Sequence, residues 1–259
     1  ATSALTCAAL SLRADAVFMS GWKDMRGMLR SDLGRKSTTY FSALLLNALL
    51  GIVVYGMLVR AMDVASFGTY NFVIAFFLFV GMFFDFGIAP AGMRLMALMR
   101  DGEDAARRIG ALLLLSVLVG IGFVLVAIAA SFAVDSVFGK NAGSIILMAA
   151  PLALVYPLQE MVLSISQGSS RMRFMSVFLV LPRVLLIAAL AFLLLTDGID
   201  ARMAVLATLV TLGAAVGIAV GYMRPVFTHL GSEIRLIFRE VREYGREIYL
   251  GRVVDGMTT

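Results

Sequence analysis

Residues 109–133 read IGALLLLSVLVGIGFVLVAIAASFA and contain no charged side chain. A helix needs about 20 consecutive apolar residues to cross the hydrocarbon core of a bilayer, which is roughly 30 Å thick. Such a helix also satisfies its own backbone hydrogen bonds, as a lipid environment requires. This stretch therefore predicts a membrane-spanning helix.

Five further stretches have the same character, and they cover residues 38–60, 70–94, 143–166, 174–195 and 203–223. Of the 259 residues in the chain, 61% are apolar and 15% are charged, whereas roughly 25% of the residues in a soluble domain are charged. We therefore predict an all-α fold, a polytopic transmembrane helical bundle of six spans.

The chain contains one cysteine, Cys7, and one histidine, His229. Neither a disulfide framework nor a Cys/His metal site can be built from them within this chain. The loops 61–69, 134–142 and 196–202 are short and hold no histidine, so they offer little acid/base equipment for catalysis. We predict no metal, no cofactor and no enzymatic activity.

Basic residues lie mostly on one side of the six predicted spans. They precede the first span, follow the second and the fourth, and follow the sixth as Arg224, Arg235, Arg239, Arg242, Arg246 and Arg252. The opposite loops hold Arg60, Lys140 and Arg202. The positive-inside rule then predicts that both ends of the six-span unit are cytoplasmic. The net charge of +5 indicates anionic inner-leaflet lipids, and not nucleic acid, as a partner.

The residues outside the spans form three segments. Residues 1–37 are expected to be a cytoplasmic leader whose second half is an interfacial amphipathic helix or a solvated basic arm. Residues 224–247 are expected to form an amphipathic linker helix on the cytoplasmic face, capped by Ser232. Residues 248–259 turn apolar again and predict the start of a truncated seventh span. We interpret the six-span lobe, residues 38–223, as part of a larger membrane domain.

Two stretches resemble the polysaccharide transporters of the multidrug/oligosaccharidyl-lipid/polysaccharide exporter superfamily. Residues 58–70, LVRAMDVASFGTY, resemble the first hairpin of that family, and we expect Phe67 and Gly68 to make its turn. Residues 84–88, FDFGI, followed by Arg94, are similar to the Asp-x-Gly motif in the family's second helix.

The resemblance covers residues 38–259 and implies the N-terminal half of a flippase. Its six helices would form one lobe of two that face each other across a central cavity and work by alternating access. The implied substrate is an O-antigen or exopolysaccharide unit linked to undecaprenyl diphosphate, and the implied place is the bacterial inner membrane. Implied partners are the missing C-terminal half and the machinery of lipopolysaccharide or exopolysaccharide assembly.

Apart from the helix ends, three ionisable side chains fall inside the predicted spans: Asp85, Glu160 and Arg183. Charges are costly at this depth and usually face a cavity or a pathway. At 1.5 Å per residue, Asp85 and Arg183 lie roughly 14 Å from the cytoplasmic helix ends, and Glu160 about 10 Å. We therefore predict one substrate-binding cavity formed by these residues and Arg94, in which the Arg183 fork binds the diphosphate and can rest against Asp85. One alternative is that Asp85 and Arg183 only hold helices together. A second is that Glu160, which lies below Pro157, faces headgroups and not a lumen.

Prolines and glycines give a second set of expectations. Pro151 and Pro157 are expected to interrupt the fourth span, and Pro182 permits a kink beside Arg183, although proline is also tolerated in membrane helices generally. A small-xxx-small repeat follows one face of the sixth span: Gly213, Gly217 and Gly221. This face is expected to pack closely against another helix.

Other functions remain open from the sequence. A cation-coupled multidrug exporter of the same superfamily would favour an acidic, arginine-poor cavity, against which Arg183 argues. A membrane glycosyltransferase, ligase or acyltransferase acting on lipid-linked sugars would need catalytic loops. An accessory scaffold is the third alternative.

Overall fold

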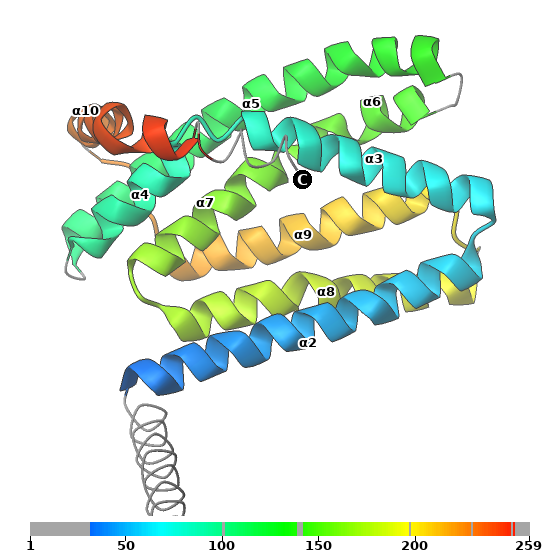
Figure 1. Cartoon of the computed structure of the whole chain (residues 1–259), viewed down its shortest axis with the longest axis horizontal. Coiled ribbons are helices and arrows are strands. Elements are labelled where there is room, and N and C mark those ends of the chain that lie inside the picture. Colours follow the sequence, from blue (N-terminus) through cyan, green and yellow to red (C-terminus); the bar gives the residue numbers. More distant parts are fainter. Residues whose placement is uncertain are drawn as a thin grey trace, which may run out of the picture.

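A computed structural model of the chain describes residues 32–99, 102–138, 142–196, 198–228, 230–249 and 251. The predicted leader before residue 32, Cys7, His229 and nearly all of the predicted seventh span lie outside these residues. The described helices are α2 (Asp32–Ala61), α3 (Val64–Phe83), α4 (Ile88–Ala97), α5 (Glu103–Phe138), α6 (Ala142–Ala153), α7 (Val155–Gly168), α8 (Met172–Thr196), α9 (Ala201–Met223), α10 (Leu230–Glu240) and the π-helical turn η1 (Val241–Gly245) (Figure 1).

Six helical segments of the described chain are long and apolar enough to cross a membrane. They are Ser37–Ala61, Val64–Phe83, Glu103–Asp135, Ala142–Gly168, Met172–Thr196 and Ala201–Met223. The predicted fold class, an all-α polytopic bundle, is confirmed.

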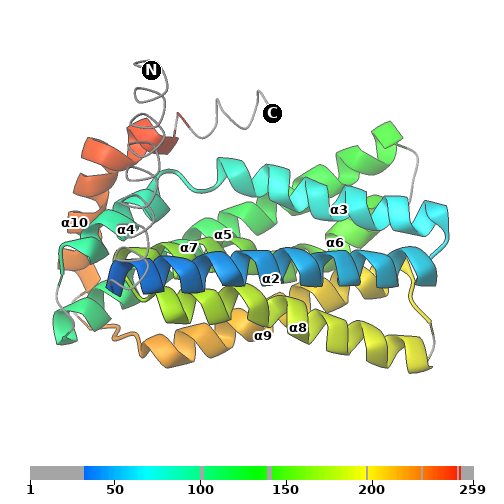
Figure 2. The same cartoon turned by 60° about the horizontal axis from the view of Figure 1, so that its bottom comes forward.

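The helices pack in pairs that together make one bundle. α2 runs along α8, and α8 packs on α9; α6 and α7 contact both α5 and α9 (Figures 1 and 2). Phe77, Phe123 and Ile146 are fully buried in the shared core. On the outside, apolar side chains such as Phe41 and Ile52 are each 68% exposed, as expected where lipid is the solvent.

The fourth span is interrupted at the place that Pro151 and Pro157 predicted. α6 ends at Ala153 and α7 begins at Val155, between Pro151 and Pro157. Pro157 has no N–H, so the carbonyl of Ala153 lacks its usual helical donor. The two helices nevertheless follow one another closely enough to count as one span.

The turn between the first two spans differs from the expected one. Phe67 and Gly68 lie inside α3, and the turn falls at Met62 and Asp63. Asp63 caps α3, because its Oδ2 accepts hydrogen bonds from the N–H groups of Ala65 and Ser66 at 3.0 and 3.2 Å. Hydrogen bonds from the side chain and backbone of Ser66 hold the pKa of Asp63 below its usual value. The prediction of a Phe-Gly turn is wrong, because an acidic cap is enough to start the helix.

The glycine repeat of the sixth span does not pack as predicted. A Cβ atom added at Gly217 or Gly221 would meet no heavy atom of the described residues within 4 Å, and one at Gly213 would meet only Val155, at 3.9 Å. Close approach occurs elsewhere, where Gly168 of α7 lies against the backbone of Met93 in α4. The prediction of tight packing at Gly213, Gly217 and Gly221 is therefore wrong for the helices described here.

The predicted linker helix is present and docks on the bundle. α10 begins at Leu230, so Ser232 lies inside its first turn and is not the predicted cap. Ile237 is fully buried, and η1 extends the helix to Gly245. The linker packs on α4 and α5 at one end of the bundle, which we call the α10 end.

Candidate functional site: a cavity beside the broken second span

The second predicted span is not one helix. α3 ends at Phe83 and α4 begins at Ile88, so residues 84–87 form a break inside the predicted 70–94 helix. The prediction of a continuous span is wrong here, because Phe86 and Gly87 take left-handed conformations with φ of 48° and 75°, which end an α-helix. The Asp-x-Gly motif is the break itself.

Asp85 stabilises the start of α4. Its Oδ1 accepts a hydrogen bond from the N–H of Ala89 at 3.0 Å, and its backbone carbonyl accepts one from the N–H of Ile88 at 3.0 Å. A carboxylate at this position accepts from N–H groups of the first helical turn, which have no helical acceptor. Its negative charge is also stabilised by the positive end of the helix dipole. The break therefore holds an acidic side chain in place within the bundle.

A cavity of about 360 Å³ opens beside this break. Residues of α3, the break, α4, α5, α7 and the segment after η1 line it, among them Asp85, Ser116, Tyr156, Glu160 and Tyr249. Ser116 is only 3% exposed, and its Oγ has no hydrogen-bond partner among the described residues. The volume falls within the roughly 300–1,000 Å³ range of small-molecule sites. Asp85 and Glu160, predicted to share a cavity, are thus brought together.

Arg183 does not join this cavity. It lies in the middle of α8, is partly buried, and makes no ion pair with Asp85. The prediction that Arg183 rests against Asp85 is wrong, because equal depth along two helices does not place two side chains on facing sides.

Arg94 also lies outside the cavity lining. Its Nη1 is 2.8 Å from Glu240 Oε1 in α10, and its guanidinium lies 4.7 Å from the centre of the Tyr244 ring in η1. A cation over an aromatic ring is attracted by the ring's quadrupole. The structure thus places Arg94 between α4 and the linker, and not with Asp85 and Glu160.

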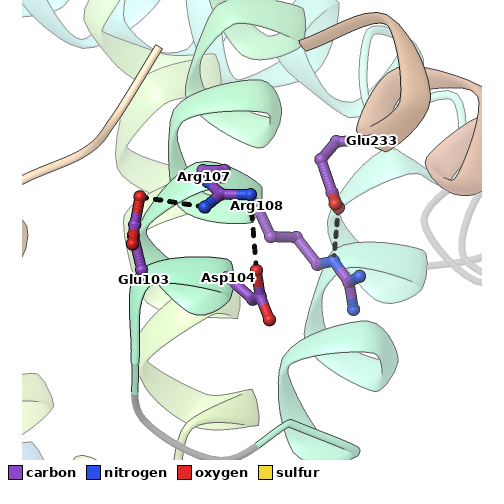
Figure 3. Close-up of polar contacts among 5 residues, drawn as sticks. All are labelled: Glu103, Asp104, Arg107, Arg108 and Glu233. Carbon is purple, nitrogen blue, oxygen red and sulfur yellow. Dashed lines mark hydrogen bonds and ion pairs between the residues drawn. The ribbon is translucent and has the colours of Figure 1, made fainter. Parts of the chain in front are cut away.

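The linker is fixed to the bundle at further points. Arg108 Nε of α5 donates to Glu233 Oε2 of α10 at 2.8 Å, and both side chains are largely buried, at 13% and 19% exposure (Figure 3). Beside it, Arg107 pairs within α5 with Glu103 and Asp104 at 2.9 and 3.5 Å (Figure 3). The buried Arg108–Glu233 pair therefore joins α5 to α10, whereas the ion pairs of Arg107 lie within α5.

The end of the linker reaches the break itself. The backbones of Gly245 and Gly87 touch so closely that a Cβ atom on either would meet the other's carbonyl. The hydroxyl of Tyr249 donates to the carbonyl of Phe83 at 3.1 Å, and its ring lies 6.0 Å from that of Phe86. Phe83 is the last residue of α3, so its carbonyl lacks a helical donor. Tyr249 supplies one.

Several cavity residues were not anticipated. Gln159 precedes Glu160 in the fourth span, and a polar side chain at that depth was a visible signal. Ser116 and Tyr156 gave no comparable signal, because both are common in membrane helices. No group of three or more His, Cys, Asp or Glu side chains able to hold a metal is found in the described part of the chain.

The fold and its six apolar helical segments define a multi-pass membrane protein. The sequence profile of the family described as "Polysaccharide biosynthesis protein" matches residues 33–245. The chain belongs to this family, which is the relationship that the hairpin and Asp-x-Gly motifs predicted. A search of curated proteins finds no significant match.

Solved structures of transporters share the fold. The chain is similar to a multidrug resistance MATE family transporter of the MOP superfamily in an outward-facing conformation, with a TM-score of 0.65, 16% identity, and coverage of 85% of this chain and 52% of that one. It is also similar to a MOP superfamily transporter from Pyrococcus furiosus whose binding pocket is described as having reverse polarity, with a TM-score of 0.62, 19% identity, and coverage of 87% and 54%. A third similar structure is a MATE protein in the straight conformation, with a TM-score of 0.65, 18% identity, and coverage of 87% of this chain and 54% of that one. The chain spans about half the length of these structures.

Proposed function

We propose that this chain is one lobe of a flippase that moves lipid-linked oligosaccharides across a bacterial inner membrane. A second lobe would complete the central cavity, and the two would rock in alternating access. The substrate would be an O-antigen or exopolysaccharide unit on undecaprenyl diphosphate, and the protein would perform no catalysis. The basic residues at the α10 end support a cytoplasmic location for that end.

One observation carries the proposal: a member of the polysaccharide biosynthesis family has a cavity with two carboxylates in its helical bundle, beside a broken helix. Broken helices line transport sites because their free backbone groups and helix ends face the cavity. The carboxylates of Asp85 and Glu160, the amide of Gln159 and the hydroxyl of Tyr156 offer the donors and acceptors that sugar hydroxyls require.

Arg183 is proposed to bind the diphosphate of the substrate. It lies mid-span, is partly buried, and has no ion-pair partner among the described residues, so its fork is available to phosphate oxygens. Arg94 is proposed to contribute indirectly, by tying α4 and therefore the break to the linker.

The test is flipping of lipid-linked sugar by the complete protein in proteoliposomes. We expect Arg183→Ala to abolish flipping and Arg183→Lys to leave partial activity, because charge survives without the planar fork. Asp85→Asn combined with Glu160→Gln should lower the rate at least about tenfold, the effect of losing about 1.4 kcal/mol of substrate interaction. Arg202→Gln, at the exposed start of α9, is the matched control and should flip at the wild-type rate. Wild-type flipping by Arg183→Ala would overturn the role of this residue.

A second candidate is a cation-coupled exporter. Among the described residues, the cavity lining holds two carboxylates and no basic side chain, which favours a cationic ligand. The two candidates separate in one experiment, in which cells expressing the complete protein are assayed for both efflux of a cationic dye and export of polysaccharide. The exporter would be selected if substitution of Asp85 and Glu160 abolished dye efflux but left polysaccharide export unchanged.

A further inference from the structure

A second hollow, of about 320 Å³, lies at the same end of the bundle as α10 and shares no lining residue with the cavity. It sits where α2 begins, α8 begins and α9 ends, and Figures 1 and 2 show these three helix ends together. Three arginines line it: Arg35, Arg171 and Arg173. Ser170 and Thr39 add hydroxyl groups, and no acidic side chain of the described residues is in the lining.

The chemistry of this hollow suits an anion with several oxygen atoms. Arginine presents a planar fork that matches phosphate oxygens, which lysine does not. Ser170 has a φ of 53°, and the helical hydrogen bonds of α8 begin with Met175 N–H donating to the Arg171 carbonyl. The N–H groups of the first turn of this 25-residue helix therefore lie at the hollow without helical acceptors, where the helix dipole favours negative charge.

The depth of the hollow along the bundle indicates which class of anion it suits. The lining residues lie within about one turn of the ends of three predicted spans, which is the depth of lipid headgroups. One helical turn further into the bilayer, Val177 follows Arg173 and Ile218 precedes Tyr222, and these side chains are 63% and 58% exposed. Tyr222 is itself 65% exposed and stacks on Phe174 with ring centres 4.9 Å apart, as is typical of the membrane interface.

We propose that this hollow is a binding site for the headgroup of an anionic phospholipid. The phosphodiester would lie against Arg173 and Arg171 at the start of α8, and the acyl chains would follow Val177 and Ile218 along the lipid-facing surface. Arg173 has no ion-pair partner among the described residues, so its guanidinium can turn to the phosphate. This site is separate from the cavity and does not depend on the transported substrate.

Lipid binding to the complete, purified protein can be measured by native mass spectrometry with phosphatidylglycerol and phosphatidylcholine, which share a phosphate but differ in net charge. We expect a preference for phosphatidylglycerol that falls about fivefold in Arg173→Gln, since one basic residue near an anionic surface is worth about that factor. Arg171→Gln should act in the same direction. Arg173→Lys should lower the preference by less than Arg173→Gln does, because lysine keeps the charge but lacks the planar fork.

The matched control is Arg239→Gln, because Arg239 is exposed on α10 at the same end of the bundle but outside the hollow. It should leave the preference unchanged. An equal loss in Arg239→Gln would show that diffuse surface charge, and not this hollow, selects the lipid, and would overturn the proposal.

The proposal would also fail if millimolar inorganic phosphate, added to protein in phosphatidylcholine, raised the melting temperature as much as phosphatidylglycerol does, since the ligand would then be a free anion. Circular dichroism of Arg173→Gln separates loss of lipid from loss of fold: a variant with wild-type helicity and wild-type preference also contradicts the site.

Discussion

The second and fifth spans respond in opposite ways to residues that disfavour helices. Residues 84–87 contain no proline, yet the predicted second span, residues 70–94, breaks there into α3 and α4. Pro182 lies in the middle of the fifth span, yet α8 runs unbroken from Met172 to Thr196. The difference shows that a membrane helix breaks where partners exist for the backbone groups that the break releases, and not simply where a weak helix former occurs.

The partners of the break can be named. Asp85 accepts from the N–H of Ala89, Tyr249 donates to the carbonyl of Phe83, and Gly245 leaves room for Gly87 to take its left-handed conformation. In α8, proline removes only the donor that would have met the carbonyl four residues earlier. One missing bond costs less than unwinding a whole turn in lipid, so the helix continues.

The largest effect should come from Gly87→Ala. The alanine would have to keep the left-handed backbone conformation of Gly87, and its Cβ atom would meet the Gly245 carbonyl. Backbone strain and overpacking together should lower the free energy of unfolding by about 3 kcal/mol. Thermal melting of the complete protein in detergent should show a large decrease. Gly217→Ala is the matched control, because an added Cβ meets no described heavy atom, and it should be neutral or stabilise by up to about 1 kcal/mol. Equal melting temperatures for the two variants would contradict the close contact.

Separating the linker from α4 should have the next largest effect. Glu240 is 14% exposed and its partner Arg94 is 48% exposed, so Glu240→Ala should cost about 1–2 kcal/mol, less than a fully buried pair. Glu103→Ala removes an ion pair within α5, whose carboxylate is 74% exposed, and should change stability by less than about 0.5 kcal/mol. The same melting assay compares them, and a larger loss in Glu103→Ala would argue against anchoring of the break through the linker.

Removing one hydroxyl tests the partner of the Phe83 carbonyl. Tyr249→Phe keeps the ring beside Phe86 but deletes the hydrogen bond, which should cost about 1 kcal/mol. Tyr55→Phe is the control, since its ring packs on Phe67 and is 54% exposed. Hydrogen exchange at the amides of residues 84–88 should increase in Tyr249→Phe only. Unchanged exchange there would remove Tyr249 from the list of partners.

The smallest effect should come from Pro182→Ala. Because α8 is already continuous, restoring one N–H should change the stability by less than about 1 kcal/mol in either direction, and the melting temperature should stay close to that of the wild type. A large stabilisation would mean that Pro182 strains α8 as much as residues 84–87 disrupt the second span, and the contrast between the two spans would disappear.

The six spans could be predicted because span length and composition are local properties, and the interruption between Pro151 and Pro157 followed from proline's missing N–H. The break at Asp85 was hidden, because Phe84 and Phe86 keep the segment apolar and because Tyr249 lies 166 residues after Phe83, whose carbonyl it meets. Depth along a helix grouped Asp85, Glu160 and Arg183, of which Asp85 and Glu160 line one cavity and Arg183 does not. Depth carries no information on which way a side chain faces. The glycine repeat was misread for a similar reason: a small face says that a neighbour could approach, not that one does.

The link between Tyr249 and Phe83 also sets an order of events during synthesis. The ribosome completes α3 long before it reaches Tyr249, which lies 166 residues later. At about 5–20 residues per second, that interval is roughly 10–30 s. Throughout it, α3 lacks the hydroxyl that satisfies its last carbonyl, and Gly87 lacks Gly245 beside it. The break can therefore reach its final geometry only after the sixth span and the linker have been synthesised.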